Sequence, residues 1–217
     1  TSPLRAKIDA PMIMAPMFAL SGEVAFVFFP LVVRAIGLLA SLVGILTVSL
    51  RDENEDPNKA LNRGYYVSSV LAAIGFAVIC NLMLPEWELF FACGLIGIVL
   101  SILIVYITQY YTAGEYRPVR KIAQASETGP ATNIITGFSI GLETTLMPVI
   151  AISIGLLGSY MLGTMAAPSA DMEFIFGLYG TAAATMGMLA TCAFILAEDT
   201  FGPITDNAGG IVEMSNQ

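Results

Sequence analysis

The stretch that decides the fold is Leu89–Thr112, which reads LFFACGLIGIVLSILIVYITQYYT and contains no charged residue. A helix that crosses the hydrocarbon core of a bilayer needs about 20 largely apolar residues. In lipid, every backbone N–H and C=O group must be satisfied within the segment, so an apolar run of this length favours an α-helix. Leu89–Thr112 is therefore predicted to be a transmembrane helix.

Four further stretches meet the same criterion of length and low charge: Ala25–Leu50, Tyr65–Leu84, Ile134–Leu162 and Phe174–Leu196. We expect an all-α membrane protein whose five transmembrane helices form a single domain over residues 1–217, with loops at 51–64 and 113–133. In the second loop, Pro118–Ser126 is predicted to form a short surface helix, because a proline precedes good helix formers. Ile8–Gly22 is short and contains two prolines, which predicts a re-entrant or interfacial segment.

The composition excludes an ordinary soluble domain. Hydrophobic residues make up 56% of the 217 residues, charged residues 12%, and mean hydropathy is +0.78, whereas roughly a quarter of residues are charged in soluble domains. The net charge of −8 argues against a nucleic-acid partner, which requires clustered Lys and Arg. The chain has no histidine, so it cannot supply His-ligated zinc or Ser–His and Cys–His pairs. Cys80, Cys93 and Cys192 lie in apolar runs and are predicted to be buried free thiols.

The basic residues predict the orientation in the membrane. The loop after the first span and the loop after the third together hold six of the nine Lys and Arg residues, whereas Pro85–Glu88 and Gly163–Glu173 hold none. Loops rich in Lys and Arg face the cytoplasm. We therefore expect 51–64 and 113–133 to be cytoplasmic, together with the segment that follows Leu196.

Acidic residues next to the last span are the strongest candidates for chemistry. Asp199 and Asp206 are seven residues apart, so a continuing helix would place them on one face, and Pro203 would kink that helix without ending it. Carboxylates on one wall suit Mg²⁺, which is held by one or two carboxylates and by substrate phosphate oxygens. The alternative is a capped helix end with solvated acids, followed by a turn that contains Gly209 and Gly210.

Two charged residues lie inside predicted spans, where ionisable groups are costly. Glu143 is about 15 Å into the fourth span at 1.5 Å per residue. It is either a proton or cation relay or an acid paired to a neighbouring helix, and pairing is favoured. Arg34 is expected to extend towards the outer membrane interface. The glycine pair Gly137 and Gly141 and the small residues from Gly177 to Gly187 predict close helix packing.

Three sequence runs carry a resemblance to a known family. They are Gln109-Tyr-Tyr-Thr through Pro118-Val, Thr128-Gly-Pro-Ala-Thr-Asn-Ile-Ile-Thr-Gly137, and Phe176-Gly-Leu-Tyr-Gly180 through Phe201-Gly-Pro-Ile-Thr-Asp-Asn-Ala-Gly-Gly-Ile-Val-Glu-Met214. With them the chain resembles the membrane-integral, ion-pumping inorganic pyrophosphatases. The resemblance is close from about Tyr106 to Gln217. At Gln109 it departs from the Glu that many relatives have there.

The resemblance implies that the chain is an internal fragment, with five spans of a bundle of about sixteen helices. The family is a homodimer that hydrolyses cytoplasmic Mg²⁺-bound pyrophosphate and moves H⁺ or Na⁺ outward, and some members depend on K⁺. In a prokaryote the protein would lie in the plasma or inner membrane. Carried over by motif, Asp206 is the catalytic, substrate-binding and metal-binding acid. Asp199 is a further metal and substrate ligand and Asn207 a substrate ligand, while a complete active site requires residues outside this chain.

A second hypothesis is a secondary transporter without hydrolytic activity. Its substrate would bind near the membrane midplane at broken helices, and Glu143 would be the coupling acid. The run from Asp199 to Gly210 discriminates between the two hypotheses, because a transporter has no evident use for paired acids and a glycine-rich segment at the membrane edge. That run favours the pump.

Overall fold

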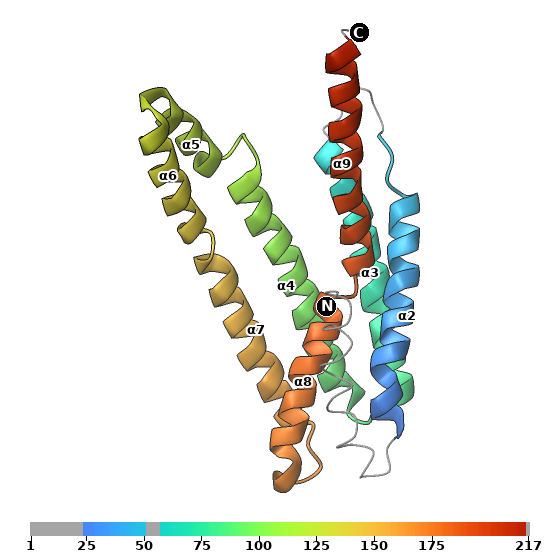
Figure 1. Ribbon diagram of the computed structural model, residues 1–217. Helices are drawn as coiled ribbons and strands as arrows, with labels where there is room; N and C mark the ends of the chain where they lie inside the picture. Colours follow the sequence, from blue (N-terminus) through green and yellow to red (C-terminus); the bar gives the residue numbers. More distant parts are fainter. Residues whose placement is uncertain (1–23, 51–56, 216–217) are drawn as a thin grey trace.

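The computed structural model describes residues 24–50 and 57–215, and every regular element in this part is helical (Figure 1). The predicted segment Ile8–Gly22 and the first half of the loop at 51–64 lie outside the described residues. The elements are α2 (Val24–Leu46), α3 (Pro57–Met83), α4 (Trp87–Thr112), α5 (Arg117–Thr128), α6 (Pro130–Glu143), α7 (Leu146–Met165), the 3₁₀ turn η1 (Ala170–Met172), α8 (Glu173–Met188) and α9 (Cys192–Ser215).

The helices confirm a multi-pass integral membrane protein. Four spans, formed by α2, α3, α4 with α5, and α6 with α7, are long and apolar enough to cross a membrane. A fifth is formed by α8 and α9 if this pair, which is bent by 41°, counts as one span. The predicted all-α architecture is therefore confirmed.

The helix ends differ from the predicted spans. Helix α3 begins at Pro57, inside the predicted loop, and α9 continues to Ser215, far beyond Leu196. The short surface helix is present as α5, with Pro118 in its first turn. Hydropathy marks only the apolar part of a helix, whereas α3 and α9 continue into polar sequence. Proline is tolerated in the first turn of a helix, as at the start of α3 and of α5.

The predicted fourth span consists of two helices. Helix α6 ends at Glu143 and α7 begins at Leu146. At the junction, the hydroxyls of Thr144 and Thr145 donate to the carbonyls of Gly141 and Leu142, at 2.7 and 2.8 Å. Helix α7 alone has 20 residues, or about 30 Å, which matches the thickness of the hydrocarbon core. Helix α7 alone is therefore long enough to cross the hydrocarbon core, and Glu143 lies at the junction between α6 and α7.

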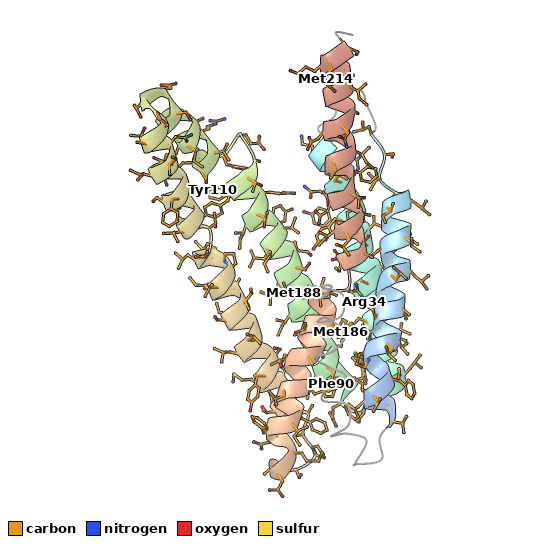
Figure 2. The ribbon with its side chains drawn as sticks, in the orientation of Figure 1. Arg34, Phe90, Tyr110, Met186, Met188 and Met214 are labelled. Atoms are coloured by element: carbon orange, nitrogen blue, oxygen red, sulfur yellow. The ribbon has the colours of Figure 1, made fainter. Side chains whose placement is uncertain are left out.

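An aromatic core holds together the end of the bundle where α2 and α4 begin. The rings of Phe26, Phe90 and Tyr179 meet edge to face, with centroids 5.1 to 6.0 Å apart. The Tyr179 hydroxyl donates to the Phe26 carbonyl at 3.0 Å. Figure 2 shows Phe90 near this end of the bundle and Met214 at the opposite end. The core therefore lies far from the C-terminal end of α9.

Helices α4 and α8 touch backbone to backbone at glycines. A Cβ added to Gly187 would lie 2.0 Å from the Gly94 carbonyl oxygen, and one added to Gly97 would lie 1.8 Å from the Ala184 carbonyl oxygen. The predicted packing of the stripe in α8 is thus confirmed. Gly137 and Gly141 have no atom of the described chain within 4 Å of an added Cβ, so the packing predicted for this pair is not found here. All three cysteines are buried, as predicted, and none forms a disulfide in the described part of the chain.

The predicted fifth span is broken between α8 and α9, at Leu189–Thr191. Arg34 of α2 lies beside this break (Figure 2), and its Nη1 donates to the carbonyl of Leu189. The expectation that Arg34 extends to the membrane interface is therefore wrong. A carbonyl released by the broken helix offers the guanidinium an acceptor within reach, so the side chain need not leave the bundle.

Candidate functional site

Helix α9 carries the candidate site at the end of the bundle where α5 meets α6 (Figure 1). From Leu196 to Ser215 it continues for about 28 Å at 1.5 Å per residue. Asp199, Asp206 and Asn207 are all exposed in this segment. The sequence-predicted residues are therefore on one helix and accessible.

Helix α9 passes through Pro203 without ending. Proline removes one backbone N–H donor from a helix and crowds the preceding turn. On both sides of it, hydroxyls bond back to the helix. Thr200 Oγ1 donates to the Ala197 carbonyl at 2.6 Å, and Thr205 Oγ1 donates to the Phe201 carbonyl at 2.9 Å. The continuous helix is what aligns the acids on either side of the proline.

We use the name acid stripe for Asp199, Asp206 and Glu213, which follow one another at intervals of seven residues on α9. Seven residues rotate an α-helix by nearly two full turns, so the three acids share a face. Gly202 and Gly209 lie on the same side, and nothing in the described chain is within 4 Å of a Cβ added to either. Sequence reasoning missed Glu213, although its distance in sequence from Asp206 repeats that between Asp199 and Asp206.

The turn at Gly209 and Gly210, which the alternative interpretation required, is absent, because α9 is continuous through both residues. Asn207, Gly209 and Gly210 all lie inside α9, which ends only at Ser215. Each glycine disfavours the helix by up to about 1 kcal/mol relative to alanine but does not forbid it. The consequence is an exposed backbone next to Asp206 instead of a loop that folds around a ligand.

The spacing of the acid stripe limits how it can bind a cation. Asp199 and Asp206 are separated by about 10.5 Å along the helix axis. Two oxygens on one Mg²⁺ ion are at most about 4.2 Å apart, which is twice the Mg–O distance. Within residues 24–50 and 57–215, no three Asp, Glu, Cys or His side chains form a group that could hold a metal. The stripe therefore suits separate ions, each completed by phosphate oxygens, water or residues outside this chain.

Glu198 is a second acid that sequence reasoning did not single out. It is half-buried and faces a cavity of about 130 Å³ between α2, α3 and α9. Apolar side chains, among them Ile45, Leu61 and Phe194, line most of this cavity. Glu198 is thus turned towards the bundle, whereas its neighbour Asp199 is exposed. The sequence gives no signal that separates these adjacent acids without knowledge of which helix face packs.

The structure places Glu143 apart from the acid stripe. Glu143 ends α6, which packs on α5, whereas α9 packs on α2 and α3 (Figure 1). The Tyr111 hydroxyl donates to Glu143 Oε1 at 3.5 Å, and the side chains of Arg117 and Lys121 line the same small pocket. Glu143 therefore has a polar partner on α4 and basic residues nearby.

Gln109, where the resemblance departs from the family, joins two helices. Its Nε2 donates to Oδ1 of Asn62 at 3.2 Å, which connects α4 to α3. A glutamate at this position could accept a hydrogen bond but could not donate one. The glutamine therefore fits a neighbour that presents an amide oxygen.

Comparisons with known proteins identify similar sequences. The model of the inorganic H⁺ pyrophosphatase family matches residues 4–217. The K(+)-insensitive pyrophosphate-energized proton pump 2 of Moorella thermoacetica is 53% identical over 206 residues, covering 93% of this chain and 29% of that protein. The pyrophosphate-energized membrane proton pump 3 of Arabidopsis thaliana is 42% identical over 231 residues, covering 99% of this chain and 29% of that protein.

A third relative, from Clostridium tetani, differs in the ion that its name gives. Its name assigns it to the K(+)-stimulated pyrophosphate-energized sodium pumps, and it is 44% identical over 189 residues, covering 87% of this chain and 27% of that protein. The chain spans less than a third of the length of each of these three relatives. Most of each relative therefore has no counterpart in this chain.

Proposed function

Because this chain belongs to the family of ion-pumping inorganic pyrophosphatases, we propose that the full-length protein hydrolyses Mg-pyrophosphate and couples this reaction to outward ion transport. Residues 1–217 form one transmembrane domain in this proposal, and the end of the bundle that holds α5 and the acid stripe faces the cytoplasm. Mg²⁺ and a homodimeric assembly are carried over from the family resemblance.

The observation that carries the proposal is the acid stripe on a helix that continues well past the apolar part of its span. Asp199 and Asp206 are exposed, and Gly202 and Gly209 leave the backbone between and beyond them uncovered. A secondary transporter would place its polar groups near the membrane midplane. An acidic face that projects from the membrane instead suits a soluble, charged substrate.

Charge explains how an acidic helix can serve an anionic substrate. Carboxylates repel pyrophosphate unless a cation lies between them. Mg²⁺, when bound, supplies this bridge and neutralises negative charge on the leaving phosphate. Asp206 would hold one such ion and Asp199 would contribute at a neighbouring ion. Asn207, beside Asp206, can donate hydrogen bonds from its amide to phosphate oxygens.

The test is Asp206→Asn in the full-length protein. We expect Mg-dependent hydrolysis of pyrophosphate to fall at least ~100-fold, because an amide cannot replace an anionic metal ligand. Membrane insertion should be unchanged, because Asp206 is exposed. Asp171→Asn is the matched control, since Asp171 is an exposed acid in η1, at the opposite end of the bundle.

Near-normal hydrolysis by the Asp206→Asn protein would remove Asp206 from the site. A full-length protein that does not hydrolyse pyrophosphate, but transports a solute when an ion gradient is applied, would instead establish the secondary transporter.

We also propose that the transported ion is H⁺ and that K⁺ is not required. The relative from Moorella thermoacetica, at 53% identity, is named as a K⁺-insensitive proton pump, whereas the K⁺-stimulated sodium pump is 44% identical. In sealed vesicles that contain the full-length protein, pyrophosphate should acidify the lumen equally with and without K⁺. Transport that requires Na⁺, or that depends on K⁺, would contradict this assignment.

A further inference from the structure

The bend between α8 and α9 lies in the hydrophobic part of a span, where released backbone groups are costly. One backbone hydrogen bond satisfies part of the bend, because Cys192 N donates to the Leu189 carbonyl at 3.1 Å. Thr191 is 2% exposed, and its Oγ1 has no hydrogen-bond partner in the described part of the chain. The polar side chain of the bend thus does not stabilise it.

The stabilising group comes from another helix. Arg34 lies about 15 Å from the start of α2 at 1.5 Å per residue, and its Nη1 donates to the same Leu189 carbonyl. Carbonyls at the C-terminal end of a helix carry partial negative charge, which favours a cation. A charge-assisted hydrogen bond is also stronger than a neutral one. Arg34 is therefore well suited to hold the end of α8.

The backbone of α2 closes on the bend one turn after Arg34. A Cβ added to Gly37 would lie 2.8 Å from the Ala190 carbonyl oxygen and 3.3 Å from Ala190 Cα. Ala190 is 3% exposed. Arg34 and Gly37 thus contact consecutive residues of the bend, one by a hydrogen bond and the other by close packing.

This contact controls the direction of a long helix. Only Cys192 and Phe194 are buried among the residues of α9. Asp206 is about 21 Å beyond Cys192 at 1.5 Å per residue, so a change of about 3° in the direction of α9 moves Asp206 by about 1 Å. A displacement of that size can lower a catalysed rate by about 100-fold.

We propose that Arg34 is a positioning residue that fixes the bend between α8 and α9 and thereby sets where the acid stripe meets its ligand. This role rests on the proposed function for its kinetic consequence, but the bend itself can be tested without pyrophosphate. Arg34 contacts neither Asp199 nor Asp206, and acts through the helix that carries them.

The experiment compares Arg34→Met, Arg34→Lys and the control Leu39→Met in the full-length protein. Leu39 is on α2 and is 61% exposed, so its replacement leaves the bend intact. In Arg34→Met, we expect backbone amides 192–195 to exchange hydrogen at least ~5-fold faster, because local opening is easier. Exchange in α7 should not change. The kcat/KM for Mg-pyrophosphate should fall at least ~10-fold through misplacement of Asp206, and Arg34→Lys should restore much of both properties.

Each result decides the proposal. Unchanged exchange in Arg34→Met would overturn the role of Arg34 at the bend. Faster exchange with unchanged kinetics would show that Arg34 supports the fold without positioning the acid stripe. If Arg34→Met does not fold, Gly37→Ala replaces it, because its Cβ would displace the Ala190 carbonyl and should produce the same two changes. A full-length protein without pyrophosphatase activity would refute the proposed function, while the exchange measurement would still test the bend.

Discussion

The two halves of the bent span differ sharply in how they are packed. In α8, nine of the 16 residues are buried, whereas in α9 only two of the 24 are. Helix α8 contacts α4 and α7 through glycines that allow backbone contact. Helix α9 exposes the acid stripe on one face and apolar residues such as Phe201, Ile204 and Ile211 elsewhere. The comparison separates a half that builds the bundle from a half whose surface is available to a ligand and to other helices.

The largest expected effect tests whether the acid stripe acts through separate ions. We expect Asp199→Asn in the full-length protein to lower hydrolysis ~10-fold, and Asp206→Asn to lower it at least ~100-fold, because each removes an anionic ligand. The carboxylates are about 10.5 Å apart along the helix, so the two losses should multiply to at least ~1,000-fold in the double variant. The measurement is the initial rate of phosphate release over a range of Mg²⁺ concentrations.

A double variant no worse than Asp206→Asn alone would show that the two acids work as one unit. In that case α9 would have to bend at Pro203 when ligand binds, and the stripe seen here would not be the arrangement that acts on substrate. Asp171→Asn again serves as the control for loss of an exposed acid.

A glycine-to-alanine pair tests the difference in packing directly. In Gly187→Ala the new Cβ would lie 2.0 Å from a backbone oxygen of α4, and overpacking of this kind costs typically about 1–3 kcal/mol. In Gly209→Ala the Cβ meets no described atom within 4 Å, and alanine favours the helix by up to about 1 kcal/mol. We expect Gly187→Ala to lower the thermal unfolding temperature and Gly209→Ala to leave it unchanged or raise it.

Measurement of pyrophosphate binding separates the same two variants further. Gly209 lies on the same side of α9 as Asp206, so its alanine variant should weaken pyrophosphate binding in a protein that is no less stable. Unfolding temperatures that change equally in the two variants would mean that α9 is packed as tightly as α8 in the full-length protein.

Hydropathy predicted where the chain crosses the membrane, because about 20 apolar residues have no other stable arrangement in lipid. It could not predict that α9 continues to Ser215, because a helix that leaves the membrane follows no apolar pattern. The heptad spacing of Asp199 and Asp206 placed them on one face, but only on the condition that the helix survives Pro203. Hydropathy also gave no sign of the break at Leu189–Thr191, since those residues are uncharged and lie in an apolar run.

The partner of Arg34 shows the same limit. In the sequence, Arg34 and Leu189 are 155 residues apart, and no local pattern connects them. A lone arginine in a span predicts a polar partner or an escape to the interface. Which of the two occurs depends on whether another helix offers a carbonyl that can accept a further hydrogen bond at the same depth, and that is a property of the assembled bundle.

The smallest expected effect concerns Glu143, the acid outside the stripe. Gln at this position can still accept the hydrogen bond from Tyr111, so we expect Glu143→Gln to change both hydrolysis and ion transport by less than ~3-fold, as for other exposed pairs. Tyr111→Phe removes the same contact from the other side and should have an effect of similar size. Both rates are measured in the same vesicles. If Glu143→Gln lowers transport much more than hydrolysis while Tyr111→Phe does not, Glu143 is a relay for the ion. The functional acids would then not be confined to α9, the exposed half of the bent span, because Glu143 at the end of α6 would be one of them.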